Sequence, residues 1–136
     1  MPLITLSVSK ELTEEQIDAL NDGFYKAILL VPGKKALALH IQDRQKFYFR
    51  GDLQNNSTQV NFAFAQLHIV GKFPYNVNKR LTDAILSCLT EVLGTTREYA
   101  HFAIIEHEIW GGMGEFQDMN YPTEAFHEIN PGLVPK

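Results

Sequence analysis

The chain has 136 residues, of which 45% are hydrophobic and 21% are charged, so it is long enough to form one domain with a hydrophobic core and too apolar to be disordered. Its net charge is -4 and no block of like charges occurs, which argues against nucleic acid or an anionic membrane as the main partner. The single cysteine, Cys88, leaves no internal disulfide. We find neither a signal-peptide pattern nor an apolar stretch of membrane-spanning length, and we expect a cytoplasmic location.

The first half of the chain predicts a strand, a helix and a second strand. Residues 3–8 alternate between two faces, which is typical of a strand. A capping-box pattern in residues 13–16 predicts a helix start, and apolar residues then recur at helical spacing until Pro32-Gly33 ends the helix. Residues 37–41 alternate again and predict the second strand. The elements that follow are a short hairpin arm at residues 48–51 and a polar loop at residues 51–58.

The second half repeats this order. Residues 60–70 form a long apolar run that predicts a strand, and residues 77–92 carry apolar side chains on one helical face. Gly94 stands at the expected end of that helix. Residues 99–105 predict a further strand. The tail from Glu115 has little periodicity.

This duplication predicts an α/β fold. We expect one domain over residues 1–136, with repeat halves at about 2–58 and 59–114 and a tail at 115–136. Each helix crossover makes the two strands of its half parallel, so the halves build one mixed sheet with both helices on one face. The strands are apolar on both sides, as in Phe62-Ala63-Phe64-Ala65. We therefore expect other subunits to cover the second face of the sheet.

Several short motifs agree in order with this architecture. The chain starts Met1-Pro2, and residues 67–72 read Leu-His-Ile-Val-Gly-Lys ahead of the second helix. Residues 37–51 and the segment Trp110-Gly111-Gly112-Met113-Gly114 add two further matches. Together these features resemble the tautomerase superfamily, which includes 4-oxalocrotonate tautomerase, macrophage migration inhibitory factor and malonate semialdehyde decarboxylase.

The resemblance implies a homotrimer with active sites between subunits and no cofactor. It also implies that Met1 is removed and that Pro2 becomes an amino-terminal secondary amine. An apolar site and nearby cations disfavour the charged amine, so the pKa of Pro2 falls and its nitrogen can act as a general base near pH 7. The expected function is keto–enol tautomerisation of a small 2-oxo acid or unsaturated carboxylate, an isomerase reaction.

Cations near this base can bind a substrate carboxylate. The resemblance places a functional lysine at Lys34 or Lys35, with Lys34 preferred, although both fit equally well as solvated turn lysines. Arg50 lies on the arm that the family sends toward a neighbour, where a surface or interface ion pair is the alternative. Lys72 follows a strand end beside the expected pocket, or shapes the turn there.

Ile69 is a candidate pocket-lining residue, for which a plain core position is the alternative. Aligned without a gap from Gly71-Lys72, the site tyrosine and asparagine of the animal factor fall on His101 and Ala103. His101 is therefore a candidate polar contact, or a satisfied buried histidine. The arginines that the decarboxylases need are replaced by Val70 and Lys72, so that reaction is not expected.

The five histidines show no close metal-ligand spacing, and we expect no metal. Alternation along the strand is also expected to place His101 and His107 on opposite faces. The alternative function is a non-catalytic trimeric binding protein of the same fold. It would show no enol turnover even with Met1 removed.

Overall fold

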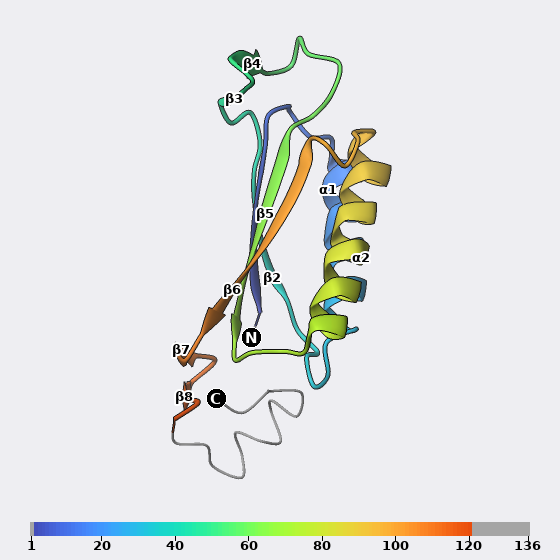
Figure 1. Ribbon diagram of the computed structural model, residues 1–136. Helices are drawn as coiled ribbons and strands as arrows, with labels where there is room; N and C mark the ends of the chain where they lie inside the picture. The colour runs from blue at the N-terminus through green and yellow to red at the C-terminus, as the bar shows by residue number, and fades with distance from the viewer. Residues whose placement is uncertain (1, 121–136) are drawn as a thin grey trace.

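Two β-α-β units build a four-stranded sheet that carries both helices on one face (Figure 1). The computed structural model describes residues 2–120. Met1, His127 and the rest of the predicted tail, residues 121–136, lie outside the described residues. The elements run in the order β1 (Leu3–Val8), α1 (Glu14–Ile28), β2 (Ala38–Gln42), β3 (Phe47–Phe49), β4 (Asp52–Gln54), β5 (Ala63–Val70), α2 (Tyr75–Leu93), β6 (Ala100–His107), β7 (Ile109–Gly112) and β8 (Glu115–Asp118).

The main sheet has the strand order β2-β1-β5-β6. Each helix joins two parallel neighbours, β1 with β2 and β5 with β6, while the central pair β1 and β5 is antiparallel. This is the mixed sheet that the duplicated sequence pattern predicts. Leu3, the first residue of β1, pairs with Ala38 on β2 and with His68 on β5. The start of β1 therefore lies beside the start of β2 and the end of β5.

The helix ends follow the local sequence signals. Thr13 caps α1 with the predicted capping box, in which its hydroxyl accepts from the Gln16 N–H and its own N–H donates to the Gln16 side chain. Gly94 ends α2 in a left-handed conformation, with φ at 64°. The helix α1 ends at Ile28, before the predicted stop at Pro32-Gly33. Val31 then lies in a turn but is still buried, which is why its apolar signal continued past the helix.

The core fills the layer between the sheet and the helices. Alternate residues of β1 and β5 point into it, and apolar residues of both helices meet them. Its largest fully buried side chains are Phe24, Ile4, Leu6, Leu20, Ile28, Leu67, Ile69, Leu81, Ile85, Leu89, Val8 and Val31. The alternation along β1 correctly predicted which side chains are buried, because successive residues of a strand point to opposite faces and only one face of β1 meets the helices.

The face of the sheet away from the helices mixes apolar and polar side chains. Its histidines, in the described part of the chain, are His40, His68, His101 and His107. The expectation that His101 and His107 lie on opposite faces is wrong. β6 runs without a bulge from Ala100 to His107, and an even separation along a strand returns a side chain to the same face.

Two small hairpins extend beyond opposite ends of the sheet (Figure 1). β3 and β4 join through Arg50 and Gly51, whose φ values are 52° and 84°, and β7 and β8 join through Met113 and Gly114, at 52° and 77°. Two consecutive positive φ values are typical of tight hairpin turns. The predicted loop at 51–58 therefore begins with a strand, and the predicted aperiodic tail begins with β8.

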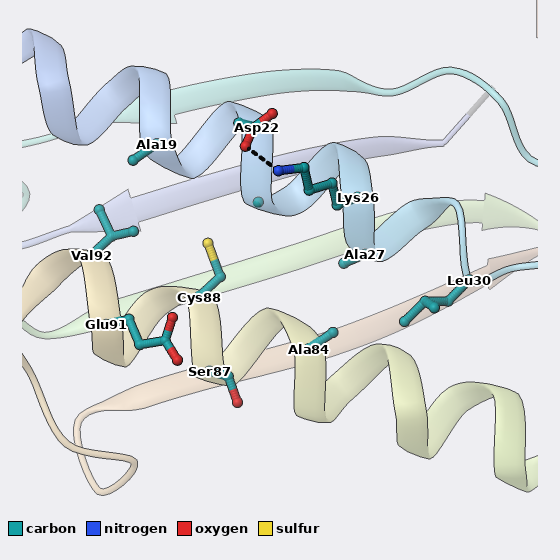
Figure 2. Close-up of a pocket in the computed structure, with 11 residues that line it drawn as sticks. Ala19, Asp22, Lys26, Ala27, Leu30, Ala84, Ser87, Cys88, Glu91 and Val92 are labelled. Atoms are coloured by element: carbon teal, nitrogen blue, oxygen red, sulfur yellow. Dashed lines mark ion pairs between the residues drawn. The ribbon is translucent and has the colours of Figure 1, made fainter.

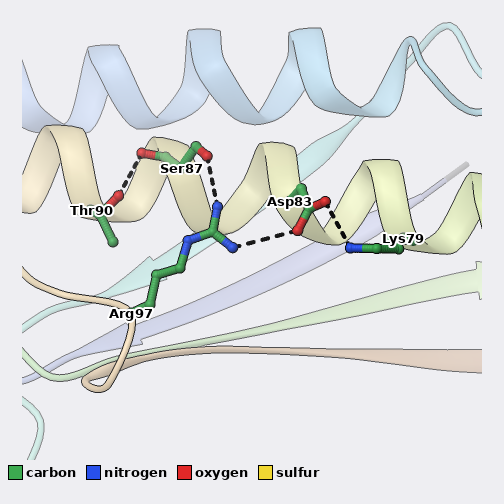
Figure 3. A network of polar contacts seen from close by, with 5 residues as sticks. All are labelled: Lys79, Asp83, Ser87, Thr90 and Arg97. Atoms are coloured by element: carbon green, nitrogen blue, oxygen red, sulfur yellow. Dashed lines mark hydrogen bonds and ion pairs between the residues drawn. The ribbon is translucent and has the colours of Figure 1, made fainter.

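A polar network holds the turn before β6 against α2 (Figure 3). Arg97 contacts Asp83 at 3.4 Å and donates to the Ser87 hydroxyl at 3.1 Å, while Lys79 pairs with Asp83 at 3.2 Å. These side chains are about half exposed, so the pairs contribute little free energy individually but fix where the turn lies. In the described part of the chain, neither helix is long and apolar enough to cross a membrane.

Candidate active site

Pro2 is buried and directly precedes β1. Its carbonyl oxygen accepts a hydrogen bond of 3.0 Å from the N–H of Ala38, the first residue of β2. In extended backbone the nitrogen and carbonyl oxygen of one residue point to the same side of the strand. The nitrogen of Pro2 is therefore directed toward β2 and the segment that leads into it, rather than toward β5.

That segment contains Lys34, a buried lysine with only 7% of its surface exposed. Its N–H donates to the Val31 carbonyl at 3.1 Å, which fixes the turn after α1, and its Nζ lies over the Phe73 ring, 5.9 Å from the centroid. Burial lowers the pKa of Lys34 from 10.5 to about 8, because the ammonium form loses water. The ammonium form therefore still predominates at pH 7.

The two candidate lysines, Lys34 and Lys35, differ in how far they are exposed to solvent. Lys35 is exposed, and its carbonyl accepts a hydrogen bond of 3.1 Å from the Tyr25 hydroxyl. Lys72 is also exposed, in the connection between β5 and α2. Ile69 lies in the core with 1% of its surface exposed, on the helix side of the sheet.

Arg50 and His101 lie at the opposite end of the sheet from Pro2 (Figure 1). Arg50 forms an ion pair of 2.6 Å with Glu98 and covers the Phe49 ring at 4.9 Å. His101 is exposed and stacks on Phe62, with ring centroids 5.2 Å apart. Within one chain, therefore, neither side chain is brought together with Pro2.

A feature that the sequence did not predict lies at the end of β5 and β6. His68 Nδ1 and His107 Nε2 are 2.9 Å apart, and the two rings stack with centroids 5.2 Å apart. Trp110, on β7, packs edge-on against His107 at 5.3 Å. Beside this stack a hollow of about 250 Å³ is lined by Gly71, Lys72, Glu106, His107, Glu108 and Met119. Sequence patterning could not have found this pair, because His107 lies beyond the strand predicted at residues 99–105 and the contact depends on the register of β5 with β6.

A larger hollow of about 430 Å³ lies between the two helices (Figure 2). Asp22 and Lys26 at its rim pair with each other at 2.9 Å. Burial, with lesser contributions from Glu91 and Asp22, raises the pKa of the Cys88 thiol to about 11. Because a thiol in this state stays protonated near pH 7, this hollow has no activated nucleophile.

Over residues 2–120, no three or more His, Cys, Asp or Glu side chains are grouped so that they could hold a metal ion. Lys34, in the segment toward which the Pro2 nitrogen is directed, is a cation that suits an anionic ligand.

Comparison with solved structures identifies the fold. The crystal structure of Leishmania major MIF2 matches with a TM-score of 0.74, at 18% identity, over 85% of this chain and 97% of that one. Pt0534, crystallised after inactivation by 2-oxo-3-pentynoate, matches with a TM-score of 0.72, at 12% identity, over 85% of this chain and 94% of Pt0534. The R7 fused 4-OT wild-type asymmetric trimer gives 0.69, at 12% identity, over 84% and 94%. This chain has the tautomerase fold.

The match extends over nearly the whole of each of these chains. The similarity is therefore one of the whole β-α-β architecture and is not limited to a local motif. By sequence, no family model and no curated protein matches. The fold resemblance that the short motifs indicated is therefore confirmed by structure, at identities of 12–18%.

Proposed function

We propose that this protein is a keto–enol tautomerase in which Pro2, after removal of Met1, is the general base. The observation that carries the proposal is the buried Pro2 at the head of β1, with its nitrogen directed toward the segment that holds the buried Lys34. Apolar burial disfavours the charged form of a secondary amine. A neutral amine can then take a proton from an enol hydroxyl or from the carbon beside a ketone, and return it to the other position.

Lys34 supplies the cation for an anionic substrate. Its ammonium form binds the carboxylate of a small 2-oxo acid or unsaturated carboxylate. The 2-oxo acid class is supported by Pt0534, which 2-oxo-3-pentynoate inactivates. Lys72 is a weaker candidate for this role because it is exposed and lies across β1 from the side that the Pro2 nitrogen faces.

We place the working site between copies of the chain, in a homotrimer. The 4-OT structure is a trimer, and within the described residues of one chain no helix covers the second face of the sheet (Figure 1). Arg50 and His101 lie far from Pro2 in their own chain, so they can contribute to a site only in a neighbouring copy. The substrate-contact roles of Arg50, Ile69 and His101 remain part of this proposal.

The test compares the wild type with Pro2→Ala on phenylpyruvate-type enols. Intact mass is measured first, because with Met1 retained the Pro2 nitrogen is an amide without a basic lone pair. We expect Pro2→Ala to lower kcat/KM by about 100-fold or more. Protein that retains Met1 is the matched control and should be inactive. Equal rates for wild type and Pro2→Ala would reject the proline base.

A second readout separates the enzyme from a binding-only protein of the same fold. In 2-oxo-3-pentynoate the triple bond is conjugated to a ketone, so a neutral amine adds to it and gains the mass of one inhibitor. We expect this adduct at Pro2 in processed wild type, with loss of turnover in parallel. A fully processed trimer that neither turns over enols nor forms the adduct would instead be the non-catalytic binding protein.

A further inference from the structure

Phe73 lies in the short connection between β5 and α2, where its ring is buried with 5% of its surface exposed. The Nζ of Lys34 lies over the face of this ring, 5.9 Å from the centroid. The two residues come from different β-α-β units, 39 positions apart in the sequence. Because the face of an aromatic ring carries negative potential, it attracts an ammonium group that burial has stripped of water.

The backbone around Phe73 is fixed from several directions. Gly71 turns the chain with φ at 98°, and its N–H donates to the His107 carbonyl at 2.8 Å. On the other side, Pro74 is the first residue outside α2, and the Asn78 side chain donates to the Phe73 carbonyl at 3.1 Å. The backbone that carries the ring is therefore held by both neighbouring elements.

We propose that Phe73 is a positioning residue, whose ring face holds the Lys34 ammonium charged and oriented for a substrate carboxylate. The inference rests on the proposed function, which assigns carboxylate binding to Lys34. Phe73 itself touches no reacting atom. Its effect on the reaction passes through Lys34, so it acts on substrate binding rather than on proton transfer.

The two local effects on Lys34 oppose each other. Burial lowers the pKa of Lys34 to about 8, while contact with a ring face favours the charged form. Removing the ring face while keeping the burial should therefore lower the pKa of Lys34 further. A smaller fraction of the protein would then carry the ammonium at neutral pH, and KM for a carboxylate substrate should rise at unchanged kcat.

The decisive experiment replaces Phe73 with pentafluorophenylalanine, which has nearly the same shape but a ring face of opposite potential. The pKa of Lys34 is followed without substrate by NMR of its ε-carbon, assigned with Lys34→Met. We expect the pKa of Lys34 to fall by about half a unit to one unit. The same replacement at Phe102, a partly buried core ring with no cation over it in the described residues, should leave that pKa unchanged.

Phe73→Leu is the second variant, since it keeps an apolar side chain and needs no artificial residue. It should also lower the pKa of Lys34 and raise KM while kcat holds. An unchanged pKa of Lys34 in both Phe73 variants would overturn the proposal, as would an equal fall in the Phe102 control. Since this pKa is measured without substrate, a shift in a protein with no enol turnover rejects the proposed function but supports the placement of Lys34 by Phe73.

Discussion

His68 Nδ1 lies 2.9 Å from His107 Nε2, which joins β5 to β6 through side chains on the face opposite the helices. Trp110 packs on the same stack, so the β7–β8 hairpin is attached to the main sheet through His107. A histidine pair can form this hydrogen bond only when at least one ring nitrogen is an unprotonated acceptor. The pair therefore constrains both the tautomers of its members and the position of the hairpin.

We predict that His107→Ala loosens the β7–β8 hairpin and lowers the free energy of unfolding by about 1–3 kcal/mol, because one hydrogen bond and two ring contacts are lost. Trp110 is the single tryptophan of the chain, so its fluorescence reports the hairpin directly and should shift to longer wavelength. His40→Ala is the matched control, since His40 is an exposed histidine on the same face. Identical behaviour of the two variants would contradict a structural role for the stack.

The lowered pKa of Lys34 predicts how substrate binding depends on pH. Above about pH 8 the ammonium is lost, so KM for a carboxylate substrate should rise about tenfold by pH 9. Lys34→Met should raise KM about 10- to 100-fold at pH 7 and remove this dependence. Lys34→Arg keeps the charge, so KM should depend less on pH than in the wild type. Lys35→Met should leave the wild-type dependence of KM on pH unchanged. A wild-type KM that stays constant from pH 7 to 9 would exclude Lys34 from the site.

The same lysine predicts a pH dependence of stability. The folded-state pKa of Lys34, about 8, is below its ordinary 10.5, so between these pH values the unfolded chain binds more protons and stability rises with pH. Below pH 8 the full cost of burying the charge applies. Lys34→Met should therefore be more stable than wild type by about 1–2 kcal/mol at pH 7, with the difference shrinking toward pH 10. Denaturant unfolding at both pH values measures it, and a constant difference would contradict the buried ammonium.

Gly23 on α1 lies against Cys88 on α2, and a Cβ at residue 23 would collide with the Cys88 sulfur. Gly23→Ala normally gains about 1 kcal/mol in a helix, but here we expect a net loss of about 1–3 kcal/mol from the forced helix separation. The double variant with Cys88→Ala should recover most of that loss. Thermal unfolding of the two single variants and the double variant gives the coupling free energy between positions 23 and 88. If the two changes in unfolding free energy simply add, the predicted collision does not occur.

Asn61 ties the end of β1 to the chain entering β5. Its buried side-chain oxygen accepts hydrogen bonds of 3.1 Å from the Ser9 N–H, the Ser9 hydroxyl and the Lys10 N–H. Asn61→Ala should cost about 2–4 kcal/mol, since the buried Ser9 hydroxyl and the partly buried Lys10 N–H lose their acceptor, while the Ser9 N–H keeps the Phe62 carbonyl. Asn56→Ala is the control, because the exposed Asn56 accepts similarly from the Glu11 N–H at 2.8 Å and should cost less than about 1 kcal/mol. Urea unfolding of both would refute the argument if the two losses were equal.

The sequence predicted those parts of the fold whose signals are local. The alternation of β1, the capping box at Thr13 and the left-handed stop at Gly94 are each decided by a few neighbouring residues. β4 and β8 were missed because strands of three and four residues, each with a single apolar side chain, are too short to show periodicity. Their signal lay in the turns, where Arg50-Gly51 and Met113-Gly114 each adopt two positive φ values.

The geometry around the proposed site could not be predicted from the sequence. Lys34 and Lys35 are equivalent as sequence, and the turn after α1 alone decides that one is buried over Phe73 while the other faces solvent. The contact between His68 and His107 depends on the register of β5 with β6, which pairs Val70 with His107. Such register comes from long-range packing, which no single-chain pattern encodes locally.

The duplicated architecture does not duplicate the proposed amine base. In the second unit, the residue directly before the first strand, β5, is Phe62. Phe62 sits in an unbroken chain, where its N–H donates to the Ser9 hydroxyl at 2.9 Å and its ring belongs to an aromatic cluster with Phe47 and Phe49. A chain has one amino terminus, so duplicating the unit cannot duplicate the base. An inactivator that reacts with an amino-terminal amine at the head of a strand can therefore label each chain at most once, although the chain contains two similar halves.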